Sequence, residues 1–117
     1  MPFWVLFIWL WVLPAVVFAA EYPLRPGDRP FDAADLATRL DAQTLEFYDG
    51  GRSRYGPGNA YAYLYSDQDI VPGTFEITDE GEVCITFNHG QTRCDLYVMN
   101  GDRLYLIDQK GDRYPVR

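Results

Sequence analysis

From Thr44 onward the chain alternates apolar and polar residues with a period of two, and short turns rich in Gly interrupt the pattern. Such alternation predicts β-strands that are buried on one face, and connections of about two to four residues predict that consecutive strands pair antiparallel. We therefore expect a mainly β fold, an antiparallel meander of about seven strands that forms a twisted sheet or a small barrel. The expected strands are 44–48, 61–65, 73–78, 82–87, 92–99, 103–109 and 113–116.

A different pattern precedes the strands. Within residues 33–41, apolar side chains recur at helical spacing, with Leu36 and Leu40 one turn apart. Asp32 is suited to cap the first turn through its carboxylate, and Phe31 can pack against Leu36 as a hydrophobic staple. We therefore predict one short amphipathic helix in front of the meander.

The start of the chain predicts export. No charged side chain occurs from residue 2 to residue 20, and small side chains near Ala19 are typical of a signal peptide, whose apolar core spans about 7–15 residues. A retained membrane anchor, which needs about 20 apolar residues, is the alternative. We predict a signal peptide over 1–19, an extended, proline-rich arm over 20–31 and a single domain over 32–117. The protein is then periplasmic or secreted, or anchored in the inner membrane if the segment is not cleaved.

The only two cysteines are Cys84 and Cys94, and the only histidine, His89, lies midway between them. A three-residue loop over 88–90, with Gly90 in the left-handed position, would place the two cysteines directly opposite each other in a hairpin. Directly opposed residues have Cα atoms about 4.5–5.5 Å apart, within disulfide range, and an exported chain meets an oxidising compartment. We therefore predict a disulfide between Cys84 and Cys94.

The predicted disulfide weakens the other interpretations of this stretch. A closed zinc site takes about four ligands, usually Cys and His, so here it would need carboxylates as well. Thiol catalysis needs a free cysteine beside a base, and in the predicted register His89 points away from both sulfurs. We predict no metal site, no cofactor and no catalytic residue.

The same register raises a conflict about which face of the hairpin is buried. Val83 and Ile85 point to the face opposite the cysteines, whereas Leu96 and Val98 share the cysteine face. Two explanations remain open. Both faces are partly covered, one of them for instance by the helix, or a bulge near Asp95 shifts the register.

Composition excludes two classes of partner. The chain carries 10 Lys and Arg against 17 Asp and Glu, a formal net charge of −7. Binding to nucleic acid or to an anionic membrane surface needs clustered basic side chains, so we expect neither partner. A membrane association would then come only from a retained N-terminal segment.

Three clusters of polar side chains have both a structural and a binding interpretation. A tyrosine stripe on one strand favours a half-buried sheet face over a sugar site. An acidic loop favours a solvated turn over a Ca²⁺ site, and a pair of arginines favours a surface loop over an anion site. These clusters are Tyr61, Tyr63 and Tyr65; Asp67 and Asp69; and Arg52 and Arg54.

From Phe31 to Arg117 the segments LATRL, TLEFYDGGRSRYG, GTFEI, GEVCITF, RCDLYV and GDRYPVR follow one another. This layout resembles a group of small exported proteins of unknown function, mostly alphaproteobacterial, and is similar in arrangement to lipocalin-like domains. The resemblance implies an exported β domain and no established activity, and it carries over no catalytic residue.

These observations favour a non-enzymatic exported domain. We expect a binding or accessory module that acts through its surface on an unknown envelope protein. The alternative is a lipocalin-like carrier that holds a small apolar ligand inside a barrel. Such a carrier would line its cavity with inward side chains such as Phe47, Tyr63, Phe75 and Ile85.

Overall fold

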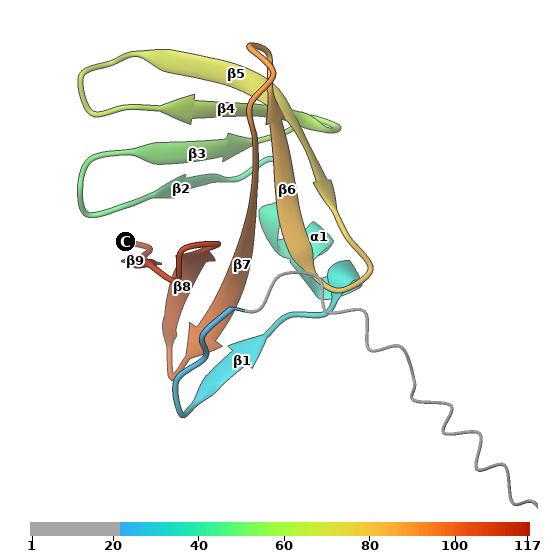
Figure 1. Ribbon diagram of the computed structural model, residues 1–117, viewed down its shortest axis with the longest axis vertical. Coiled ribbons are helices and arrows are strands. Elements are labelled where there is room, and N and C mark those ends of the chain that lie inside the picture. The colour runs from blue at the N-terminus through green and yellow to red at the C-terminus, as the bar shows by residue number, and fades with distance from the viewer. Residues whose placement is uncertain (1–21) are drawn as a thin grey trace, which may run out of the picture.

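The computed structural model describes residues 22–117, so the expected signal peptide and the first two residues of the expected arm lie outside the described residues. The expectation of a mainly β fold with one short helix is confirmed: the described residues form one antiparallel sheet of nine strands with a single helix (Figure 1). The strands are β1 (Asp28–Pro30), β2 (Thr44–Glu46), β3 (Arg52–Tyr55), β4 (Ala60–Leu64), β5 (Ile70–Ile77), β6 (Glu82–Phe87), β7 (Thr92–Asn100), β8 (Arg103–Asp108) and β9 (Arg113–Pro115).

The meander from β2 to β9 keeps its strands in sequence order, each paired with the next. The sheet curls into a half-barrel, so that the two ends of the meander, β2 and β9, approach each other (Figure 1). An isolated bridge joins Phe47 to Val116, and the Arg117 N–H donates to the Glu46 carbonyl at 2.8 Å. We call this junction the seam.

The helix α1 (Ala33–Leu40) forms where its pattern predicts. The Asp32 carboxylate accepts a hydrogen bond from the Asp35 N–H at 2.8 Å, which satisfies a free donor of the first turn. Leu36 and Leu40 are buried in the same core as Val83. The helix therefore packs its apolar face into the half-barrel interior. Among residues 22–117, no helix is long and apolar enough to cross a membrane.

The hairpin of β6 and β7 has the predicted register. Cys84 lies opposite Cys94 with 4.0 Å between their Cα atoms, and the disulfide is formed, which confirms the prediction. The turn needs Gly90, whose φ of +97° lies in the left-handed region. Pairing continues from Glu82 to Thr86 without a bulge, so the bulge near Asp95 is ruled out as the explanation of the two apolar faces.

Both faces of the hairpin are covered, and the outer one is covered by the N-terminal arm. Leu96, Val98 and Ile107 form a small second core on the outside of the sheet, beneath Tyr22 and Tyr105. The helix is on the inner side and does not supply this cover.

The arm is held in place by a strand that the sequence pattern does not predict. Its segment β1 pairs antiparallel with the end of β7, beyond the last residue that β6 reaches. Asp28 accepts two hydrogen bonds of 2.8 Å from the guanidinium of Arg113 and one of 2.9 Å from Asn100. Arg113 also lies 4.8 Å from the ring centre of Tyr105. These contacts fix the arm across the outer core.

Candidate functional site

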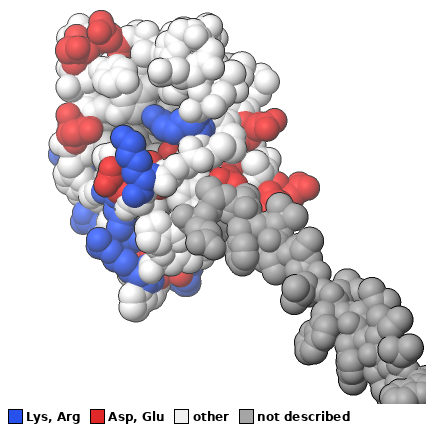
Figure 2. Space-filling model, in the orientation of Figure 1, with Lys and Arg blue, Asp and Glu red and all other residues white. Residues whose placement is uncertain are grey.

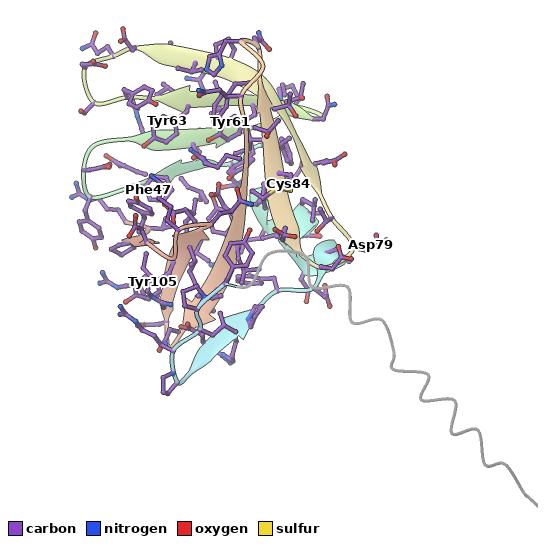
Figure 3. The ribbon with its side chains drawn as sticks, in the orientation of Figure 1. Phe47, Tyr61, Tyr63, Asp79, Cys84 and Tyr105 are labelled. Carbon is purple, nitrogen blue, oxygen red and sulfur yellow. A yellow bond between two sulfur atoms is a disulfide. The ribbon has the colours of Figure 1, made fainter. Side chains whose placement is uncertain are left out.

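A cavity of about 210 Å³ opens on the inner side of the half-barrel, away from the disulfide. Aromatic side chains and charged side chains contribute to its lining in similar measure. Phe47 and Tyr63 belong to this lining, and they can be followed with the neighbouring Tyr61 in Figure 3. The lining residues are Phe47, Asp49, Ser53, Tyr63, Tyr65, Arg93, Asp95, Leu106, Asp108 and Tyr114.

Asp95, on β7, lies in the cavity wall with its side chain 0 % exposed. Its Oδ2 accepts a hydrogen bond from Arg93 Nε at 3.0 Å. Its Oδ1 has no hydrogen-bond partner among residues 22–117. A buried acceptor without a partner is costly, and such atoms are uncommon in native proteins. Asp95 therefore brings an unpaired buried acceptor to the wall of the cavity.

A second carboxylate raises the cost of this arrangement. Asp95 is directly opposite Asp108 in the pairing of β7 with β8, and both line the cavity. Like charges directly opposite each other destabilise a sheet. Desolvation by burial raises the pKa of Asp95 to about 6, and Arg93 opposes that rise. The carboxylate is therefore easily protonated, and a cation or a hydrogen-bond donor in the cavity would stabilise its ionised form.

Arg93 connects Asp95 to Tyr61 and Ser53 through a network of hydrogen bonds. One of its terminal nitrogens donates to the Tyr61 hydroxyl at 3.3 Å, and that hydroxyl shares a hydrogen bond of 2.9 Å with Ser53 Oγ. The guanidinium also lies 5.8 Å from the ring centre of Tyr63. This network fixes the position of the Arg93 side chain in the cavity lining.

The mouth of the cavity is acidic and aromatic. The Asp49 carboxylate accepts from the Gly51 N–H at 2.8 Å and so shapes the loop after β2. A Cβ at Gly51 would collide with the Tyr63 hydroxyl, so a larger residue there would displace the Tyr63 side chain. With Asp95 and Asp108, the lining has three carboxylates against the single guanidinium of Arg93. The cavity therefore has an excess of negative charge when all three are ionised.

The residues that the sequence suggested as ligand-lining divide into two pairs. Phe47 and Tyr63 do line the cavity. Phe75 instead packs in the core with its ring centre 5.0 Å from that of Tyr55, and Ile85 is buried in the same core. Neither of these two reaches the cavity lining.

The polar part of the site was missed, although a signal for it was present. The predicted register already placed Asp95 on the same face as Val83 and Ile85, and the structure places it there. A carboxylate on an apolar strand face is an exception to the pattern and indicates a special role. Arg93 shares that face. Asp108 could be located only once the pairing of β7 with β8 was known.

The other candidate groups lie outside the cavity lining. His89 is exposed at the tip of the β6–β7 hairpin, where it stacks on Phe87. Asp67 accepts from the Asp69 N–H at 3.0 Å within an exposed turn. The structure corrects the loop expected around the arginine pair: Arg52 and Arg54 are on strand β3 with exposed side chains.

The tyrosine stripe grades from core to surface. Tyr61 is buried, Tyr63 is half-buried and Tyr65 is exposed.

One further group, at the disulfide, brings together potential metal ligands from Glu82 and both cysteines. Both sulfurs are in the disulfide and Glu82 accepts a hydrogen bond of 2.7 Å from the Tyr22 hydroxyl, so these groups are already engaged.

Comparisons with protein-family models, with curated proteins and with solved structures find no match to this chain. The resemblance to small exported lipocalin-like domains therefore stays a prediction.

Proposed function

We propose that the chain is an exported, non-enzymatic binding module of the cell envelope, and that its cavity holds a small cationic ligand such as an alkylammonium group. The observation that carries the proposal is the buried Oδ1 of Asp95, which has no partner among the described residues and belongs to the cavity wall. The disulfide supports export, because disulfides persist in oxidising compartments.

Charge and aromatic surface support a cation. Asp49 and Asp108 add negative charge around Asp95, and only Arg93 opposes it within the lining. Tyr63, Tyr65 and other rings of the lining offer π faces that attract ammonium groups. The volume of about 210 Å³ is below the usual range for drug-sized ligands, about 300–1,000 Å³, so the ligand is small.

The same lining disfavours the apolar ligand that the lipocalin-like alternative requires. An apolar molecule would cover Asp95 without supplying the missing donor, and leaving a buried carboxylate oxygen unpaired costs free energy. The two ligand classes therefore make opposite predictions for a change at Asp95.

Binding of two small probes, the cation ethylammonium and the apolar 1-octanol, would test the proposal. We expect ethylammonium to shift the backbone amide NMR signals of residues 93–95 and 106–108. The Asp95→Asn variant should weaken this binding at least about tenfold, which corresponds to about 1.4 kcal/mol. The control is Asp79→Asn, which removes the same charge from the exposed β5–β6 turn (Figure 3) and should leave the affinity unchanged.

Two results would contradict the proposal. Preferential, saturable binding of 1-octanol that Asp95→Asn leaves intact would establish the apolar carrier in its place. Ethylammonium binding that falls equally in the Asp79→Asn control would reduce the effect to overall charge.

A further inference from the structure

A second concave region shares no lining residue with the cavity. It has a volume of about 490 Å³, and its lining includes Arg39 from α1, Arg103 from β8 and the chain end at Arg117. Phe47 lines the cavity, and Val116, its partner in the bridge at the seam, lines this second region. We call the second region the arginine groove.

Aromatic rings hold the guanidinium groups in place. Arg103 and Arg117 both lie over the ring of Tyr48, at 5.7 and 5.4 Å from its centre. Arg103 also donates to the Tyr48 hydroxyl at 3.2 Å. Arg39 lies 5.4 Å from the ring centre of Phe31. Stacking on a ring leaves the edge of a guanidinium, which carries its N–H donors, available to a ligand.

The groove is rich in basic side chains, although the chain as a whole is acidic. Acidic residues outnumber basic ones 17 to 10, yet the side chains of the groove include three arginines and one carboxylate, Asp102. In the described part of the chain, ion pairs form only at Arg93 and Arg113, so the groove arginines have none. In Figure 2 basic side chains gather over the part of the surface where β8 and β9 lie in Figure 1.

We propose that the arginine groove binds a small oxyanion with two or more negative charges, carried by phosphate or carboxylate groups. Guanidinium groups match the geometry of these oxyanions through paired N–H donors, and such charge-assisted hydrogen bonds are among the stronger ones. The groove volume is within the usual range for small-molecule sites. This site rests on residues separate from those of the cationic ligand, so either can fail without the other.

Titration with inorganic phosphate and with citrate, at ionic strength held constant with sodium chloride, would test the proposal. We expect saturable shifts of the amide NMR signals of residues 102–104 and 116–117. Tighter binding of phosphate assigns a phosphorylated ligand, and tighter binding of citrate assigns a polycarboxylate. Binding of neither anion overturns the proposal.

The variant with Arg103→Gln and Arg117→Gln should lose at least tenfold in affinity for the preferred anion. Its matched control, Arg52→Gln with Arg54→Gln, removes two exposed arginines from β3 and should change the affinity less than twofold. Equal losses in the two variants would show a general charge effect and overturn the site. The single Arg117→Gln variant, which changes only an exposed side chain, serves if the double variant unfolds. Ethylammonium binding at the cavity should persist in all of them.

Discussion

Asp95 combines conditions that a carboxylate seldom meets together. It is fully buried, one of its oxygens lacks a partner among the described residues, and a second carboxylate, Asp108, is directly opposite it. Each of these conditions lowers the stability of the fold. Sites that break local rules at a cost in stability are where function is expected.

The pH dependence of stability offers a direct check on Asp95. Its pKa is raised from 3.8 to about 6 in the folded state, so the folded chain holds this proton more tightly than the unfolded chain. Stability should therefore rise as the pH falls from about 7 to about 4, by up to about 3 kcal/mol from this group. Urea unfolding of the Asp95→Asn variant should lack this rise. If the variant and the chain with Asp95 show the same slope of unfolding free energy against pH over that range, the raised pKa of Asp95 is wrong.

The carboxylate of Asp28 has the opposite effect on the pH dependence of stability, and it acts at lower pH. Hydrogen bonds from Arg113 hold the pKa of Asp28 well below its usual value. The stability that Asp28 contributes is therefore present above about pH 4 and is lost at lower pH. Because the two ranges adjoin, the protein should be most stable near pH 4–5 as far as these two groups determine it.

Among the elements, those with local signals could be predicted and those with distant partners could not. The β6–β7 hairpin was predictable to the residue, because its turn, its length and its two cysteines all specify one register. The strand β1 was not, since it is short, contains Pro30 and finds its partner on β7 far along the chain. For the strand β3 the sequence predicts a loop instead, because its outward residues are arginines and its inward Ser53 is polar.

The anchoring of β1 can be tested by removing one charge. The Asp28→Asn variant keeps the shape of the side chain but leaves the guanidinium of Arg113 without its carboxylate. We expect the free energy of unfolding to fall by about 2 kcal/mol, because hydrogen bonds between charged groups contribute about that much. Amide exchange should accelerate in β1 while β4 and β5 keep their protection. Unchanged exchange in β1 would show that backbone pairing alone holds the arm. The exposed Asp102→Asn is the matched control.

At the scale of the whole molecule, closure of the sheet depends on accumulated twist, which no single strand encodes. The sequence allowed a twisted sheet or a small barrel, and the structure is a half-barrel whose ends meet at one bridge, Phe47 to Val116. Where the cavity and the arginine groove open follows from this partial closure. Their lining residues come from elements that only the curled sheet brings together, so the sequence suggested single lining residues but could not locate either region.

Hydrogen exchange across the sheet would test this architecture. The strand β7 pairs with β6, β8 and β1, whereas β2 and β9 each have one full strand neighbour. We expect the slowest amide exchange in β6, β7 and β8 and the fastest in β2 and β9, because local opening starts where the fewest contacts must break. Equally slow exchange in β2 and β9 would instead indicate a fully closed barrel in solution.

The pairing of β1 with β7 also sets an order in time. The register joins Asp28 to Asn100 and Pro30 to Val98, across most of the described chain. Contacts between distant residues form late in folding, because the loss of loop entropy must first be offset by local hairpins. The arm, which is synthesised before the strand it pairs with, is therefore expected to dock last, after β7 has paired with both of its neighbours in the meander. Until then the outer core of Leu96, Val98 and Ile107 stays open to solvent.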